Sequence, residues 1–115
     1  MPPGRLSPRT TSSPACALEV GRRNRPPAVW FEGTAHVADA LEQRNGPGDA
    51  TAAAQLLTDV QTSQTTGPNN DGLGIIAASK DGLSDCGGDS YYASLHTGAT
   101  AWYLLAAQRV NPFAP

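Results

Sequence analysis

Residues 89–113, DSYYASLHTGATAWYLLAAQRVNPF, decide the fold of this chain. Two tyrosines and a histidine lead into a helix expected over 95–109. The helix should end at Asn111-Pro112, because a proline disfavours the α conformation of the residue before it. The helix is rich in small residues and apolar almost all round, a pattern typical of a protein interior. It therefore predicts a helix packed inside a larger helical domain.

Upstream of this helix, residues 32–64 predict a hairpin of two amphipathic helices. The first is expected over 32–44, and its apolar residues recur at spacings of three and four. This apolar stripe consists of Trp30, Thr34, Val37 and Leu41. A second, polar stripe follows the same rhythm and consists of Glu32, His36, Asp39 and Gln43. The first helix is thus expected to bury one stripe and expose the other.

The second helix of the hairpin is expected over 49–64, with Asp49 as its N-cap. Its buried stripe should consist of Ala53, Leu56, Leu57 and Val60. The turn between the helices, Asn-Gly-Pro-Gly at 45–48, is a strong helix stop. A turn this short implies antiparallel neighbours.

A long Gly-rich connection spans residues 65–92. The segment 73–78, LGIIAA, is expected to pair as a short strand within it. Connections longer than about 12–15 residues are uncommon unless they line a site or are disordered. The apolar and aromatic residues of this one favour the lining of a site.

Composition limits what the chain can be. Its 115 residues allow one domain, and its hydrophobic share of 39% includes many alanines, which bury little area. Residues 1–27 read as a disordered leader rich in Pro, Arg and Ser, with five arginines against one glutamate. Residues 28–115 carry three basic residues against nine acidic ones, a formal charge of −6. An acidic folded part argues against a nucleic-acid partner.

Motifs for metals, membranes and export are missing from the sequence. Cys16 and Cys86 stand alone without metal-ligand spacing, and two free thiols are favoured over a disulfide. No apolar run approaches the ~20 residues needed to cross a bilayer, and the start has no signal-peptide pattern. The expectation is a cytoplasmic chain with no cofactor, no metal and no membrane contact.

Three blocks carry a resemblance to a known family: WFEGTAHVADAL (30–41), IIAASKDGL (75–83) and SYYASLHTGATAWYLLAAQRVNPF (90–113). They resemble the C-terminal end of bacterial six-hairpin glycosidase-like proteins, whose helices form an (α/α)6 toroid. The resemblance implies an all-α fold over residues 28–115. That part would be a partial toroid of about one and a half hairpins with one long Gly-rich loop, and a C-terminal fragment of the family's domain.

The resemblance implies a carbohydrate-active function of the glycoside hydrolase type, inactive without the remaining hairpins. Such chemistry needs paired carboxylates beside a sugar ring. Glu32 is the expected catalytic carboxylate, since neighbouring aromatic rings can desolvate it and stack on a sugar. The expected substrate-binding residues are Trp30, His36, Asp81, Asp89, Tyr91, Tyr92 and His96.

Each of these residues also has a purely structural explanation. Glu32 is an acid in a first helical turn, where acids are common. His36 follows four residues later, where it either orients Glu32 through a hydrogen bond or simply lies with it on an exposed helix face. His96 is more often a structural histidine than a catalyst. Asp-Gly pairs are typical of turns, and a role in a turn is favoured for Asp71 and Asp85. For Asp81 and Asp89 both the turn role and the site role stay open. Trp102 and Tyr103 are expected in the core.

Two further interpretations compete with the glycosidase-like one. The chain is alternatively a small non-catalytic helical domain that docks a partner chain through the apolar helix over 95–109. A third interpretation is an open reading frame without a function.

Overall fold

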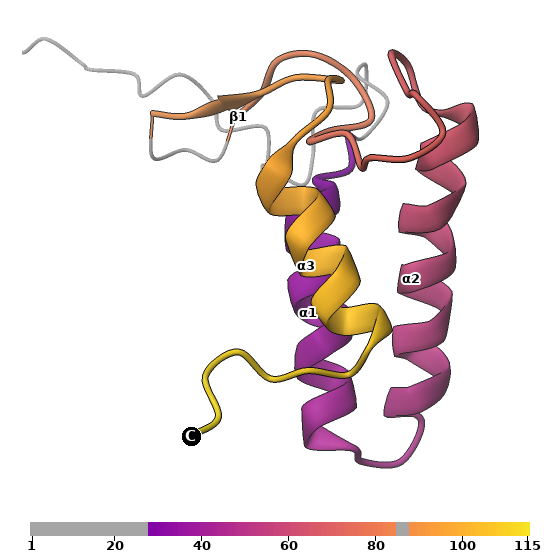
Figure 1. Cartoon of the computed structure of the whole chain (residues 1–115), viewed down its shortest axis with the longest axis vertical. Coiled ribbons are helices and arrows are strands. Elements are labelled where there is room, and N and C mark those ends of the chain that lie inside the picture. The colour runs from indigo at the N-terminus through magenta and orange to yellow at the C-terminus, as the bar shows by residue number, and fades with distance from the viewer. Residues whose placement is uncertain (1–27, 85–87) are drawn as a thin grey trace, which may run out of the picture.

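The computed structural model describes residues 28–84 and 88–115, which form a mostly helical fold (Figure 1). The helices are α1 (Phe31–Arg44), α2 (Asp49–Thr66) and α3 (Thr97–Ala107). Two short strands, β1 (Leu83–Ser84) and β2 (Ser90–Tyr91), pair antiparallel. The prediction of a helical fold is confirmed at this level, while the small sheet was not anticipated.

The three helices lie side by side, as Figure 1 shows. α1 and α2 form the predicted antiparallel hairpin, and α3 runs in the same direction as α1. α1 packs against both other helices, whereas α2 and α3 touch only slightly. The connection after α2 crosses the end of the molecule where α1 and α3 begin. The N-terminal ends of these two helices are therefore brought together beneath the connection.

The buried side of α1 differs from the predicted stripe. Its buried apolar residues are Phe31, Ala35 and Ala38, whereas Val37 is 52% exposed. The sequence stripe was wrong at Val37, although Leu41 packs against the core, because α1 has neighbours on two sides and the small alanines let those helices approach closely. One residue of the polar stripe is covered as well: Asp39 is only 4% exposed.

The turn between α1 and α2 is held by Asp49 in a way the sequence did not indicate. Gly48 occupies the N-cap position with φ 80°, so the N-cap prediction for Asp49 was wrong. The Asp49 carboxylate accepts hydrogen bonds from the Gly46 N–H at 2.8 Å and from Arg44 Nε and Nη2 at 2.7 and 2.6 Å. This bidentate ion pair ties the last turn of α1 to the first turn of α2.

Two apolar clusters form the core. Near the crossing connection, the first contains Phe31, Val60, Ile75, Ile76 and Ala99, with Tyr103 packed against it. The second contains Ala38, Ala53 and Ala106, with Leu41, Leu56 and Leu57 packed against it. The predicted buried stripe of α2 is thus confirmed, and so is the core position of Tyr103.

Residues 75–78 form the buried base of the connection. They do not form the predicted strand but pair through isolated bridges, Ile76 with Leu95 and Ala78 with Trp30. The Ala77 N–H also donates to the Ser94 carbonyl at 2.9 Å. The segment links α1 to the chain before α3, and its pairing is too short and divided for a strand.

α3 is covered on one side only by the described residues. It is shorter than predicted, and only Ala99 and Ala106 are fully buried. The opposite stripe is exposed and consists of Thr97, Ala101, Leu104 and Gln108. One side of α3 therefore packs well, and the exposed side carries the apolar Ala101 and Leu104 between the polar Thr97 and Gln108.

Some expectations fall outside the described residues: those for 1–27, Cys16, Asp85 and Cys86. Across 28–84 and 88–115, every helix is too short or too polar to span a bilayer.

Candidate functional site

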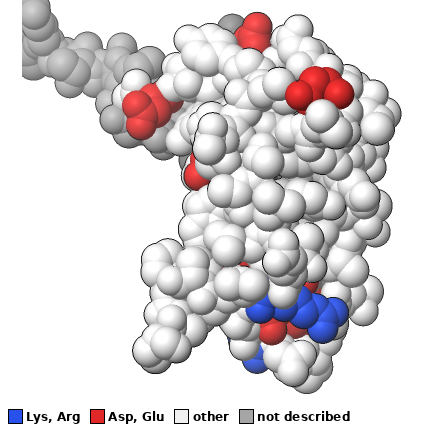
Figure 2. All heavy atoms as spheres, viewed as in Figure 1, with Lys and Arg blue, Asp and Glu red and all other residues white. Residues whose placement is uncertain are grey.

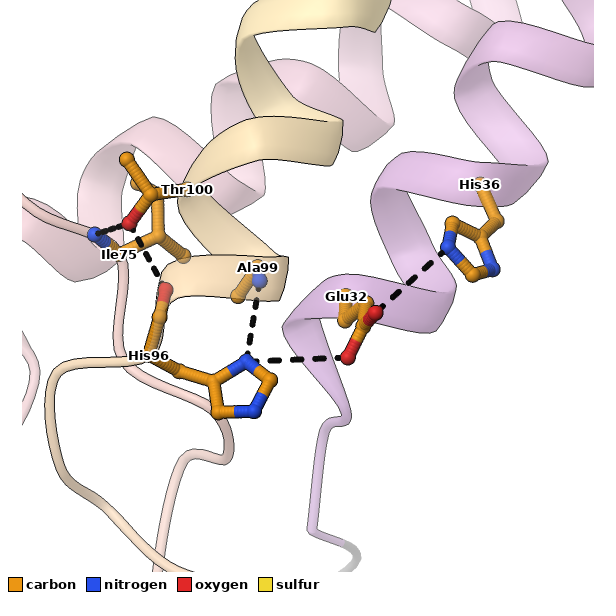
Figure 3. A network of polar contacts seen from close by, with 6 residues as sticks. All are labelled: Glu32, His36, Ile75, His96, Ala99 and Thr100. Carbon is orange, nitrogen blue, oxygen red and sulfur yellow. Dashed lines mark hydrogen bonds and ion pairs between the residues drawn. The ribbon is translucent and has the colours of Figure 1, made fainter. Parts of the chain in front are cut away.

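The carboxylate of Glu32, in the first turn of α1, lies between two imidazole rings (Figure 3). Its Oε1 is 3.8 Å from His36 Nε2, one turn further along α1. Its Oε2 is 3.7 Å from His96 Nδ1, at the start of α3. Two helices thus bring together three ionisable groups that are far apart in the sequence.

His96 is fixed by hydrogen bonds on its backbone and its ring. It is the N-cap of α3, where its Nδ1 accepts the Ala99 N–H at 3.0 Å. Its own N–H donates to the Ile75 carbonyl at 2.9 Å. The Thr100 hydroxyl donates to the His96 carbonyl and accepts the Ile75 N–H, as Figure 3 shows. The ring is therefore held against the first turn of α3 and the buried segment before it.

The cap hydrogen bond determines the tautomer of His96. A backbone N–H can only donate, so Nδ1 must be the acceptor and the ring proton lies on Nε2. Glu32 Oε2 therefore faces a nitrogen with no proton to give. Both imidazole contacts of Glu32 exceed hydrogen-bonding distance. The carboxylate is only 18% exposed and has no hydrogen bond within residues 28–84 and 88–115.

Gly98 makes room for this carboxylate. A Cβ placed on Gly98 would lie 2.9 Å from Glu32 Oε1 and 2.9 Å from His96 Cε1. Only glycine lets Glu32 rest against the first turn of α3. That position is favourable for a negative charge, because the N–H dipoles of both α1 and α3 point toward it.

Aromatic rings pack around the two histidines that flank the carboxylate. The Trp30 ring covers Gly33, where a Cβ would lie 2.3 Å from a ring carbon. Trp30 packs on Tyr91 with a centroid distance of 5.2 Å and edge-on to His36 at 6.0 Å. Trp30 Nε1 and His36 Nε2 are both buried, and neither has a hydrogen-bond partner in the described part of the chain. Such unpaired buried groups are costly and rare.

A hollow of about 350 Å³ opens beside Glu32. Its lining is mostly polar and includes Glu32, Asp89, Tyr91, Tyr92, Ser94 and His96. We call it the Glu32 hollow. Its size lies within the range of small-ligand sites.

Most of the residues predicted for a site meet here. Glu32, Asp89, Tyr91, Tyr92 and His96 line the Glu32 hollow, and Trp30 and His36 pack behind its wall. Asp81 does not reach it. Its carboxylate instead accepts the Ala93 N–H at 2.9 Å, which ties a turn to the chain before α3. The turn role expected for Asp71 is confirmed, as it accepts the N–H groups of Leu73 and Gly74, which lower its pKa.

Trp102 lies beside the site although the sequence placed it in the core. Its ring packs edge-on to His36 with a centroid distance of 4.0 Å. It lines a second hollow of about 460 Å³ together with His36, Asp39, Gln43, Asn111 and Phe113. We call this the Trp102 hollow. The polar stripe of α1 was the available signal, since three of its members line this hollow.

Oppositely charged side chains lie together at the far end of the molecule. Figure 2 shows Lys and Arg at the end that carries the α1–α2 turn, next to acidic side chains. There Arg44 pairs with Asp49, and Arg109 Nε lies 3.9 Å from Glu42 Oε1. Burial raises the pKa of Glu42, against the opposing effect of Arg109. The described residues contain no group of side chains arranged to hold a metal ion.

The fold and the site define a helical domain with a carboxylate–imidazole cluster beside two hollows. No protein-family model, curated protein or solved structure matches the chain. What the site does is therefore inferred from its own geometry.

Proposed function

We propose that the Glu32 hollow binds a carbohydrate and that the chain is part of a carbohydrate-active helical domain. The observation that carries this proposal is the state of Glu32. Its carboxylate is mostly buried at the edge of a hollow, has no hydrogen bond in the described residues, and lies between two imidazoles. Burying a carboxylate is costly unless hydrogen bonds compensate for the lost water. A ligand rich in hydroxyl groups supplies those bonds.

Sugars match the neighbouring groups too. Each hydroxyl can donate and accept, so one ring can serve Glu32 and the serine and tyrosine hydroxyls of the same hollow. The half-exposed ring of Tyr92 offers an apolar face for the C–H groups of a sugar. A mixture of aromatic walls and a few converging polar groups is typical of small-molecule sites.

Glu32 is the group best placed for acid–base chemistry in such a site. Glycoside hydrolysis uses two carboxyl groups on either side of the scissile bond. Asp89 lines the same hollow and is the proposed second carboxylate. Catalysis would also need walls that close over the sugar, which we assign to further helices of a six-hairpin toroid. The exposed Ala101 and Leu104 of α3 support this assignment, because they are suited to contact another helix.

The exposed stripe that contains Ala101 and Leu104 supports the second candidate, a non-catalytic domain that docks a partner chain through α3. Leu104 is half exposed at its centre, flanked by Ala101. The two candidates differ at Glu32: a docking domain needs no ligand there.

Titration with neutral oligosaccharides tests the proposal, with binding measured by calorimetry. Glu32→Gln should weaken binding by at least tenfold, because hydrogen bonds to a charged group are worth ~1.5–3 kcal/mol. Asp59→Asn is the matched control, since this carboxylate lies exposed on α2. Equal affinities of the wild type and the Glu32 variant, or no binding to any oligosaccharide, would remove the carbohydrate proposal and leave the docking domain.

A further inference from the structure

We infer that the ligand is an extended, uncharged glycan that lies along α1 across both hollows. This inference rests on the proposed function and adds a second sugar-binding subsite, the Trp102 hollow. The contact between Glu32 and His36 marks the boundary between the two subsites, since Glu32 lines one hollow and His36 the other.

The polar stripe of α1 connects the two hollows. Glu32, His36, Asp39 and Gln43 follow each other at intervals of three and four residues on one helix face. At a rise of 1.5 Å per residue, Glu32 and Gln43 lie roughly 16 Å apart along the axis. That length exceeds what one sugar ring can cover. A ligand that reaches from Glu32 to Gln43 must therefore contain several sugar units.

Two aromatic rings make the Trp102 hollow suitable for a sugar. Trp102 and Phe113 have a centroid distance of 6.0 Å and an interplanar angle of 36°. Asn111 holds the tail in place, because its Oδ1 accepts the Phe113 N–H at 2.9 Å. Phe113 is 82% exposed, so its ring offers apolar surface to a ligand. A sugar stacked on these rings would cover this surface.

Polar groups at the side of this hollow complement the rings. The Asp39 carboxylate accepts a hydrogen bond from Gln43 Nε2 at 3.2 Å. Gln43 Nε2 also donates a hydrogen bond to the Arg109 carbonyl at 3.3 Å. This bond joins α1 to the segment that follows α3. Asp39 and Gln43 both line the hollow and are held in position by these bonds. Fixed carboxylate and amide groups can select among sugar hydroxyls.

The charges of the lining disfavour an acidic glycan. Among the described residues that line the two hollows, the carboxylates are Glu32, Asp39 and Asp89, and none is Lys or Arg. A uronic acid or a sulfated sugar would add negative charge beside these carboxylates, where the described lining residues include no Lys or Arg. The chemistry therefore points to neutral sugars.

Calorimetry with a length series tests the inference. The probes are malto-, cello- and manno-oligosaccharides from the disaccharide to the hexasaccharide, with oligogalacturonates as acidic probes. Affinity should rise with length in one neutral series and be absent in the acidic one. Phe113→Ala should weaken hexasaccharide binding about tenfold, the loss expected of one aromatic contact, and leave disaccharide binding unchanged. Because the Phe113 side chain is exposed, we expect this variant to fold like the wild type.

Two further variants complete the design. Trp102→Ala should act like Phe113→Ala, whereas Leu104→Ala, on the exposed side of α3, should bind like the wild type. Affinity that does not depend on length, with no effect of Phe113→Ala, would overturn the second subsite but leave the carbohydrate proposal standing. Tight binding of the oligogalacturonates would overturn the assignment to neutral sugars. If no oligosaccharide binds at all, the proposed function itself fails.

Discussion

The carboxylate of Glu32 rests on Gly98, so closely that a Cβ on residue 98 would lie 2.9 Å from Glu32 Oε1. Gly98→Ala must therefore displace Glu32, the His96 ring or the start of α3. Alanine is the better helix former, so helical content should not fall. We expect oligosaccharide affinity to drop at least tenfold, as for Glu32→Gln, which calorimetry measures.

Thr97→Ala is the control for this prediction, because Thr97 is exposed in the same helical turn. It should bind like the wild type. Unchanged affinity of the Gly98 variant would show that the position of Glu32 does not matter to the ligand.

A second prediction concerns the buried side of α1. Ala38 is fully buried against α2 and α3, so Ala38→Leu should overpack this contact and destabilise the chain by about 1–3 kcal/mol. Val37 is half exposed, so Val37→Leu should change stability by less than about 0.5 kcal/mol. Urea unfolding followed by circular dichroism measures both. A larger loss of stability for Val37→Leu than for Ala38→Leu would support the stripe predicted from the sequence instead.

The choice of the buried face of α1 marks the limit of what the sequence could predict. Periodicity predicted α1, α2 and their hairpin, because spacings of three and four residues report a helix directly, and the apolar run that ends at Asn-Pro predicted α3. Periodicity did not choose the buried side of α1, since alanines at 35 and 38 give a weak apolar signal although they permit the closest packing. The pairing of β1 with β2 was missed because two-residue strands show no alternation.

The site was predictable by residue type but not by geometry. The sequence suggested Glu32, Tyr91 and His96 together, and the structure brings them to one hollow. It did not indicate Gly98 or the orientation of Trp102, because both depend on how α3 lies against α1. The family resemblance that suggested a toroid stays a prediction.

The third prediction concerns the ion pair at the α1–α2 turn. Hydrogen bonds from Arg44 and the Gly46 N–H lower the pKa of Asp49 from 3.8 to about 2. Because the folded pKa lies below the unfolded one, the unfolded state binds more protons between these values, and stability falls as pH drops through this range. Above pH ~4 the contribution should be fully present.

Asp49→Asn should therefore flatten the dependence of stability on pH between about 4 and 2, and it should be less stable than the wild type at pH 7. Urea midpoints measured across this range provide the test. Parallel curves for the two proteins would mean that Asp49 carries no such contribution.

Glu42 should produce the opposite pH dependence. Burial raises its pKa, so the folded state holds the proton more tightly than the unfolded state. Stability should then fall as pH rises above the ordinary pKa of 4.5, through the raised folded value. Glu42→Gln should lack this fall. The urea midpoints of both proteins from pH 4 to 7 check it, and an identical slope would contradict it.

The most direct test of the central claim uses the two indole N–H signals of Trp30 and Trp102 in a ¹⁵N-labelled chain. Trp30 Nε1 is buried behind the Glu32 hollow, and Trp102 lines the other hollow. On titration with a neutral hexasaccharide, both signals should shift with one dissociation constant, and a disaccharide should move Trp30 alone. Indole signals that stay in place while the amides of Ala101 and Leu104 shift would contradict a glycan site at Glu32.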